Sequence, residues 1–379
     1  MRGVLWWETI VDVLKIGIVG SGGIAIQHGQ GWLTNAERAK VVAVADVSED
    51  RARQFRDRYT AGEAKLYDDI EALLLDPEVD AVDICLPHHL HTSAIVASAN
   101  AGKAILCEKP LCTSLDDAAL IRDTLSRTGV TLMGAHNQLF QPAMIEARRL
   151  LDAGTLGQPY ILRSFEVHQS QGFGKSRGDS DLAAGESPWA WRMDPARAGG
   201  GEILDTGWHG TYRLLALAAD RPIEVSTMLG RFYIDTLQVE DTGLISVRFA
   251  SGMIGEILTS WAFANVGGMH FEIGCEHGSI AGGATTLLHQ LHGWKEAAER
   301  QLAPVHTFTA EITHFLNVIQ RGATNPATVD DGARALQVIT AAYRSAAEQR
   351  TITLPEDPTL PGEPATHRHQ TPFSVPLPA

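Results

Sequence analysis

The chain has 379 residues, of which 44 % are hydrophobic and 20 % charged, and its formal net charge is −14. This length exceeds what one hydrophobic core usually organises, so we expect a globular protein of two domains. The acidic balance and the lack of lysine or arginine runs oppose nucleic acid as a partner, because such a surface repels polyanions. Membrane partners are not expected either, since no apolar run approaches the ~18 residues of a bilayer span.

An apolar strand followed by a glycine turn stands near the N-terminus. Residues 16–19 lead into Gly20-x-Gly22-x-x-Ala25, and a helix-compatible segment follows. Gly20 permits a tight turn, Gly22 lets the backbone approach a pyrophosphate, and the helix N-terminus attracts the phosphates. The pattern predicts a dinucleotide-binding unit. The turn residues expected at the cofactor are Gly20, Gly22, Gly23 and Ile24.

A second apolar run, residues 41–45, ends in Asp46. An acid at the tip of the second strand can accept hydrogen bonds from the adenosine ribose hydroxyls, and its charge repels a 2′-phosphate. Val47 and Ser48 follow, so no arginine stands directly beside Asp46 to hold such a phosphate. We therefore expect NAD as the cofactor, with NADP disfavoured.

The order and length of the predicted elements change along the chain. Up to about residue 138, short apolar strands alternate with helices, which predicts a parallel sheet covered on both faces. Beyond it, longer alternating segments between residues 160 and 274 predict an antiparallel sheet, and two helices near 309–321 and 331–348 follow. A long irregular loop, residues 169–201, separates these segments, and loops of that length are usually functional. We expect an α/β protein with domains 14–138 and 139–354, and with terminal extensions 1–13 and 355–379, the latter a loosely packed tail.

Three further motifs carry polar residues at expected strand and helix ends. Leu86-Pro87 closes one strand and His91 lies shortly after it, while Glu108-Lys109-Pro110 directly follows the strand 104–107. Asp205 and His209 follow a triple glycine at helical spacing, so a helix would present both on one face. In order and spacing, the motifs between residues 14 and 354 resemble the glucose–fructose oxidoreductase / inositol dehydrogenase (Gfo/Idh/MocA) family.

The resemblance implies a Rossmann domain joined to an α/β domain with a large open, mainly antiparallel sheet. It implies that His209 is the general base, that Lys109 polarises the substrate oxygen, and that Asp205 orients His209 or binds substrate. The family commonly has an acid three residues after this histidine, where Tyr212 stands here. Further cofactor contacts are expected at Leu86, Pro87, His91, Glu108 and Lys109.

Substrate contacts are expected from polar and aromatic residues around the domain junction and the long loop. His136 and Asn137 follow the last strand of the first domain. Flat tryptophan faces suit the C–H surfaces of carbohydrates, and an arginine can donate to hydroxyls or a carboxylate. The candidates are His136, Asn137, Trp191, Arg192 and Trp208, with Trp189 beside them. Packing in the core is the alternative for each tryptophan and for the His136-Asn137 pair.

These expectations combine into an NAD-dependent dehydrogenase that oxidises a secondary hydroxyl of a sugar, a polyol such as inositol, or a sugar acid. Two alternatives stay open: redox-neutral catalysis with NAD retained, and a non-catalytic NAD-sensing regulator. No metal site is expected, because His88, His89 and His91 lack further ligands nearby. The four cysteines lack metal-ligand spacing and predict reduced thiols in the cytoplasm.

A homo-oligomer is expected from the second sheet. The helices of the second domain can cover only one of its faces, and the resemblance implies that subunits pair through the other face into a dimer or tetramer. The apolar residues expected to compete for burial on that face are Leu244, Ile254, Ile257 and Trp261.

Overall fold

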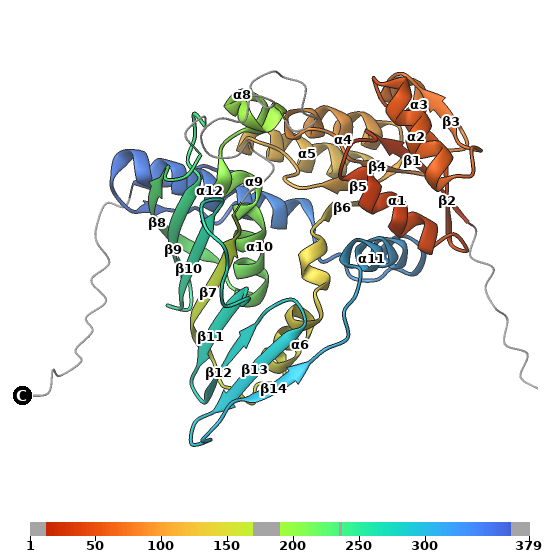
Figure 1. Ribbon diagram of the computed structural model, residues 1–379. Coiled ribbons are helices and arrows are strands. Elements are labelled where there is room, and N and C mark those ends of the chain that lie inside the picture. Colours follow the sequence, from red (N-terminus) through yellow and green to blue (C-terminus); the bar gives the residue numbers. More distant parts are fainter. Residues whose placement is uncertain (1–12, 170–189, 235–236, 365–379) are drawn as a thin grey trace, which may run out of the picture.

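The computed structural model describes residues 13–169, 190–234 and 237–364, which build two sheets (Figure 1). The first sheet has six parallel strands in the order β3-β2-β1-β4-β5-β6. This order confirms the predicted doubly wound N-terminal half. Its strands are β1 (Leu14–Val19), β2 (Ala39–Ala45), β3 (Lys65–Tyr67), β4 (Ala81–Ile84), β5 (Ala104–Glu108) and β6 (Leu132–Ala135).

Helices connect these strands by crossovers. Right-handed crossovers put α1 and α2 on one face of the sheet and α4 and α5 on the other. The strands are buried on both sides, as their continuous apolar runs require. The connecting helices are α1 (Ala25–Thr34), α2 (Glu49–Tyr59), α3 (Ile70–Leu74), α4 (His91–Asn100) and α5 (Leu115–Thr128), with a 3-10 turn η1 (His88–Leu90) before α4.

The second sheet has ten strands in the order β14-β13-β12-β11-β7-β10-β9-β8-β15-β16. Only β7 and β10 pair in parallel, so the sheet is mainly antiparallel, as predicted. Its strands are β7 (Pro159–Val167), β8 (Pro222–Gly230), β9 (Thr242–Phe249), β10 (Ile254–Ser260), β11 (Phe271–Cys275), β12 (Gly278–Gly282), β13 (Thr286–Leu291), β14 (Ala298–Gln301), β15 (Ile352–Thr353) and β16 (Glu363–Pro364). The other elements are η2 (Asn137–Phe140), α6 (Pro142–Asp152), η3 (Ala190–Met193), α8 (Pro195–Ala198), α9 (Glu202–Asp205), α10 (Gly207–Ala218), α11 (Thr307–Arg321) and α12 (Val329–Glu348).

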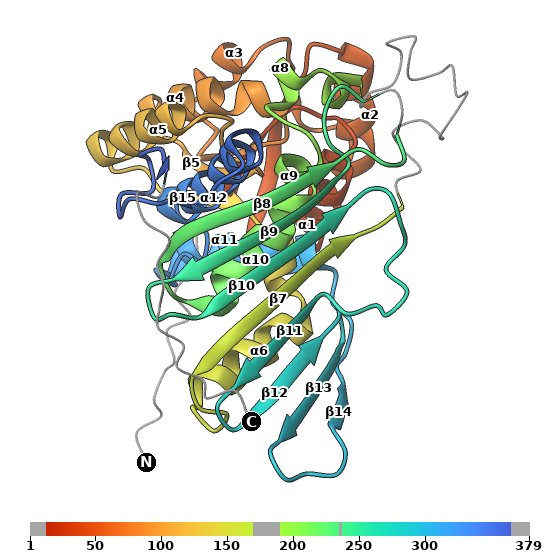
Figure 2. The same ribbon diagram turned by 90° about the vertical axis from the view of Figure 1, so that its left-hand side faces the viewer.

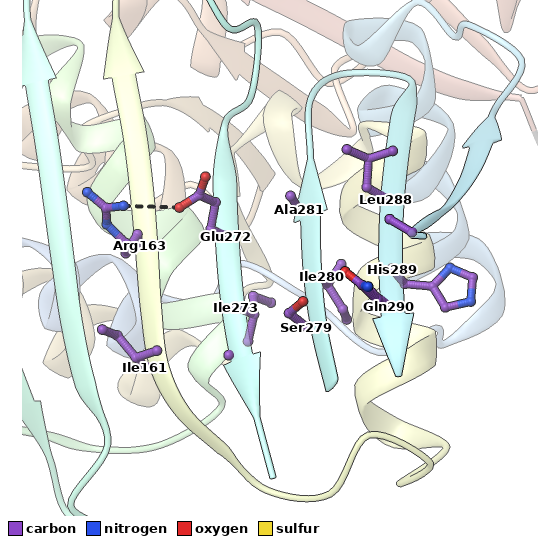
Figure 3. Close-up of a pocket in the computed structure, with 12 residues that line it drawn as sticks. Ile161, Arg163, Glu272, Ile273, Ser279, Ile280, Ala281, Leu288, His289 and Gln290 are labelled. Carbon is purple, nitrogen blue, oxygen red and sulfur yellow. Dashed lines mark hydrogen bonds and ion pairs between the residues drawn. The ribbon is translucent and has the colours of Figure 1, made fainter. Parts of the chain in front are cut away.

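Helices cover one face of the ten-stranded sheet, where α10 packs against β7 and β10, α6 against β12 and β13, and α12 against β8. The opposite face carries no helix among the described residues and is turned to the viewer in Figure 2. Strand register aligns an apolar row across this open face: Met228, Leu244, Leu258 and Phe165. Figure 3 shows a neighbouring part of the same face, where a shallow hollow lies beside the Arg163–Glu272 ion pair.

The prediction for the open face is wrong for two residues. Leu244 and Ile254 are 37 % and 41 % exposed, but Ile257 and Trp261 are only 0 % and 1 % exposed. Ile257 lies near Gly210 of α10, and the Trp261 indole donates a hydrogen bond to Thr206. Both therefore belong to the helix-covered side.

The structure also corrects two expectations about the ends of elements. Asp205 ends α9 and His209 lies in α10, so the single helix predicted to carry both is interrupted at Thr206. The tail predicted from residue 355 begins with packed structure, because Asp357 pairs with Arg122 and residues 363–364 form β16 against β15.

One helix of the second half of the chain packs on the first sheet's layer. Figure 1 shows α11 beside α1, where Phe308 and Phe315 contact the rings of His28 and Trp32 at centroid distances of 5.5 and 6.2 Å. Within the described residues, no helix combines the length and apolarity needed to cross a bilayer.

Candidate active site

A cavity of about 560 Å³ lies at the carboxyl ends of the first sheet's parallel strands, which is where ligands bind in such folds. Residues from the glycine turn and residues from the second half of the chain line the same space. Its walls include Gly20, Gly22, Gly23, Ile24, Asp46, Arg51, Leu86, Pro87, Glu108, Lys109, Trp191, Arg192, Thr206 and His209.

The glycine turn fits a dinucleotide. Gly20 has φ +87°, and a Cβ there would lie 2.8 Å from the Cys85 carbonyl oxygen, so a side chain is excluded. A Cβ on Gly22 would meet no atom within 4 Å, so the backbone there borders open space. A pyrophosphate can approach that backbone and the N-terminus of α1 directly.

Asp46 lies at the end of β2 as predicted, but its carboxylate already has several partners. Its oxygens accept hydrogen bonds from the Ser21 amide and hydroxyl and from the Ser48 amide, each at 2.8 Å. Arg51, in the first turn of α2, donates to it at 2.8 Å. Burial alone would raise the pKa of Asp46, but Arg51 and these amides hold it below its usual value.

This arrangement corrects the expectation that no arginine is placed beside Asp46 to hold a 2′-phosphate. Arg51 lines the cavity and its side chain is 47 % exposed. Ribose hydroxyls that approach Asp46 would compete with Arg51 and the Ser21 hydroxyl. Arg51 is five residues beyond Asp46. Ser48 caps α2 by accepting from the Arg51 amide, and this cap places Arg51 next to the end of β2.

His91 contacts the backbone and not the cavity. It is fully buried, and its two ring nitrogens lie 2.6 Å from the Pro110 carbonyl oxygen and 2.8 Å from that of Leu86. The ring thereby ties the end of β4 to the turn after β5. The cofactor contact predicted for His91 is replaced by indirect support of Leu86 and Pro87, which do line the cavity.

Glu108 is anchored by a buried ionic network that the sequence reasoning missed. His28 of α1 lies 3.1 Å from Glu108 through Nε2 and 2.9 Å from Asp83 through Nδ1. Burial disfavours a charged imidazole, but Asp83 outweighs it and raises the pKa of His28 well above 6.5. Burial would likewise raise the pKa of Glu108, yet His28 and then Lys109 lower it to about 2. The lone acid in the apolar strand β4 was the signal that a buried cation stands opposite.

Lys109 and Asp205 form a second buried ion pair. The Lys109 Nζ donates to the Asp205 backbone oxygen at 2.7 Å and to its carboxylate at 3.2 Å. Arg192 lies 3.2 Å from the other carboxylate oxygen and His88 4.0 Å from the first. Although burial opposes ionisation, Lys109 and Arg192 keep the pKa of Asp205 far below its usual value. Asp205 is thus directed at Lys109 and Arg192.

His209 is half-buried and lines the cavity beside Lys109. Burial and then Lys109 lower its pKa to about 4, so the ring is neutral at pH 7 and can accept a proton.

The remaining predicted substrate residues divide between the cavity and the core. Trp191 and Arg192 line the cavity, with the guanidinium 5.3 Å from the indole centroid. Trp208 is 0 % exposed and donates to His136, so its predicted substrate contact is wrong. His136 is itself buried and stacks on Tyr212 at 3.5 Å.

Asn137 is directed away from the cavity, since its side-chain amide donates to Thr307 at the start of α11. Trp189 and most of the predicted loop, residues 170–189, lie outside the described residues.

Comparison with known proteins assigns the family. The model of an oxidoreductase family with an NAD-binding Rossmann fold, GFO_IDH_MocA, matches residues 14–136, and the GFO/IDH/MocA C-terminal domain model matches residues 144–281. The chain belongs to the Gfo/Idh/MocA family. This confirms the predicted NAD-binding oxidoreductase.

Relatives of this oxidoreductase align over nearly their full length. Myo-inositol 2-dehydrogenase of Thermotoga maritima is 26 % identical over 90 % of this chain and 99 % of that protein. The scyllo-inositol 2-dehydrogenase (NAD(+)) of Bacillus subtilis is 27 % identical over 88 % of this chain and 94 % of that protein. A solved complex of levoglucosan dehydrogenase with NADH and levoglucosan has the same fold, with a TM-score of 0.80 at 21 % identity over 91 % of this chain and all of that one.

Proposed function

We propose that this oxidoreductase oxidises a secondary hydroxyl of a sugar, a polyol such as inositol, or a sugar acid, by removing a hydride from the carbon that carries the hydroxyl. The observation that supports it most directly is the shared cavity, in which His209 and Lys109 face the same space as the glycine turn. Relatives named as inositol dehydrogenases support the substrate class.

The roles of the residues follow from their charge states. His209, neutral because burial and Lys109 lower its pKa to about 4, accepts the hydroxyl proton. The Lys109 ammonium, held by Asp205, stabilises negative charge that develops on the substrate oxygen. Bound NAD supplies the hydride acceptor at nicotinamide C4. Arg192 and Trp191 contact the remainder of the substrate.

The test is a screen of sugars, inositols and aldonates with NAD, followed by NADH absorbance and by product analysis. Steady NADH accumulation with one of these substrates is the expected result. Conversion of substrate without NADH accumulation would replace the proposal by redox-neutral catalysis. The absence of any turnover across the screen would favour an NAD-sensing regulator.

A further inference from the structure

A second carboxylate, Glu166 at the end of β7, lies against the helix that carries His209. His209 and Arg213 are four residues apart in α10 and therefore share one face of it. β7 packs on this face: the Ser164 hydroxyl donates to the Gly210 carbonyl at 2.8 Å. A Cβ added at Gly210, the neighbour of His209, would lie 3.3 Å from the Glu166 Cβ.

Arg213 fixes Glu166 in place. Its Nη2 donates to the Glu166 carboxylate at 2.7 Å, and its Nη1 donates to Ser164, to the Phe165 carbonyl and to the His270 carbonyl at 3.1–3.2 Å. The guanidinium is 3 % exposed, so these contacts determine its position. Burial would raise the pKa of Glu166, but Arg213 and His209 outweigh it and hold the pKa below its usual value. Glu166 is therefore an anion at neutral pH.

One oxygen of the Glu166 carboxylate has only a weak hydrogen-bond partner. Oε1 accepts from the Gln138 amide at 3.4 Å, and the side chain is 16 % exposed. Asp205, the acid predicted to orient His209, is instead bound to Lys109 and Arg192.

The charges that act on His209 come from three parts of the fold. Glu108 ends β5 and Lys109 directly follows it, Glu166 stands on β7 and Arg213 on α10, with the neutral His136 nearby. Of the two carboxylates, Glu108 has both oxygens occupied, Oε1 by His28 and Oε2 by the Lys109 amide, whereas Glu166 keeps Oε1 weakly bound. Glu166 is thus the anion that can respond when His209 becomes charged.

We propose that Glu166 is a positioning residue of the base, the counter-ion that stabilises His209 once it has taken the substrate proton. This inference rests on the proposed function. In the step itself, the substrate O–H bond breaks and its proton moves to a ring nitrogen of His209, while the C–H electron pair leaves as hydride to NAD and the carbonyl forms. The positive charge that develops on His209 then faces the carboxylate that Arg213 holds.

The decisive experiment titrates the His209 ring by NMR in the cofactor-free protein, with the resonance assigned by its loss in His209→Gln. Glu166→Gln keeps the size and an oxygen for Arg213 but removes the charge. Its His209 should titrate about one pH unit lower than wild type. Glu166→Asp, the matched variant that keeps the charge, should restore at least half of that difference. An unchanged His209 titration in a folded Glu166→Gln protein would overturn the proposal.

Kinetics supply the second readout. Glu166→Gln should lower kcat about tenfold or more with little change in the KM for NAD, and should add little to the loss in His209→Gln, because the two residues act as a unit. Additive losses would contradict the proposal. If Glu166→Gln fails to fold, the same titration difference is measured between Arg213→Met and Arg213→Met/Glu166→Met, where no arginine is left unpaired.

The NMR titration needs no substrate, so the two proposals fail separately. A shifted His209 titration without turnover on any polyol would contradict the proposed function and leave the role of Glu166 standing. Turnover with an unshifted titration would sink the role of Glu166 alone.

Discussion

We propose that Asp46 and Arg51 decide the choice of cofactor. Asp46 repels a 2′-phosphate, while Arg51 could bind one if Asp46 did not already hold it. We expect wild type to prefer NAD by about tenfold or more in kcat/KM, on the order of 1.4 kcal/mol. Asp46→Ser should raise kcat/KM with NADP, because it frees the guanidinium.

The double variant Asp46→Ser/Arg51→Ala is the control for that gain. It should lose the improvement with NADP if Arg51 is the phosphate ligand. Equal efficiency with both cofactors in wild type would show that the Asp46 charge does not discriminate between them.

The reacting centre gives a prediction for activity and its pH dependence. Lys109→Ala and His209→Ala should each lower kcat by about a hundredfold or more. NAD binding, followed by fluorescence titration, should survive in His209→Ala. Since the pKa of His209 is about 4 and the neutral ring is the proposed base, kcat/KM should fall as the pH drops through that value. The exposed His292→Ala serves as the matched control, and normal turnover in His209→Ala would refute its assignment as base.

The buried pair of His28 and Glu108 predicts a pH-dependent stability. The lowered pKa of Glu108 stabilises the fold above 4.5, an effect lost as the pH falls towards 2. The raised pKa of His28 stabilises it below 6.5, an effect lost as the pH rises through the folded value. His28→Gln should therefore lower the unfolding free energy most near pH 5.5, by about 3–5 kcal/mol, because it leaves buried carboxylates unpaired.

Urea unfolding at pH 3, 5.5 and 9 measures this cost. His292→Gln, at an exposed histidine, is the control and should change the unfolding free energy by less than about 0.5 kcal/mol. A loss in His28→Gln that is the same at all three pH values would contradict the ionic account.

At the scale of elements, local sequence patterns predicted the helices, strands and turns that neighbouring residues determine. The glycine turn, β4, β5 and α12 follow from apolar periodicity and caps, and they lie within a few residues of their predicted bounds. The break at Thr206 between α9 and α10 could not be predicted, because the local spacing is helical. At the break the Thr206 hydroxyl accepts a hydrogen bond from the distant Trp261 indole and donates to the buried Glu202 four residues earlier.

The candidate site also contains residues that local motifs predicted and residues that depend on distant partners. The motifs identified Lys109, Asp205 and His209, which the fold gathers around one cavity or its wall. His28 and Glu166 were missed, because each acquires its role from a partner 47 or more residues away in the chain. The wrong expectation for Trp208 arose since a tryptophan beside a motif looks the same in sequence whether it is buried or exposed.

The N-terminus of α12 offers a test of local stabilisation. Thr328 and Asp331 form a capping box, in which each side chain accepts from the other's backbone amide. Thr328→Ala should lower the unfolding free energy by about 1 kcal/mol. Thr324→Ala, at an exposed position a few residues earlier, is the matched control. Equal unfolding midpoints for the two variants would show that the cap contributes nothing.

For the whole molecule, the open face of the ten-stranded sheet predicts assembly. Met228 and Leu244 expose 76 % and 37 % of their surface on a face without helices in the described part of the chain. A two-fold contact through it should bury more than about 1,000 Å². Light scattering at micromolar concentration should then give a multiple of the 40.9 kDa chain mass.

Leu244→Arg tests that contact and should shift the mass to that of one chain. Leu120→Arg, at an exposed leucine of α5, should leave it unchanged. A monomeric wild type would rule the assembly out.

The packing of α11 on α1 limits how this protein could be recombined. A Cβ added at Gly31 would lie 2.5 Å from the end of the Ile312 side chain and 3.3 Å from the Phe308 carbonyl oxygen, so the two helices approach each other closely there. A chimaera that joins residues 14–138 to the second half of another protein would lack α11 and would expose the edge of the Trp32 ring. The nucleotide-binding half therefore cannot be exchanged alone. A chimaera has to include α11 as well, although almost 170 residues of sequence separate that helix from residue 138.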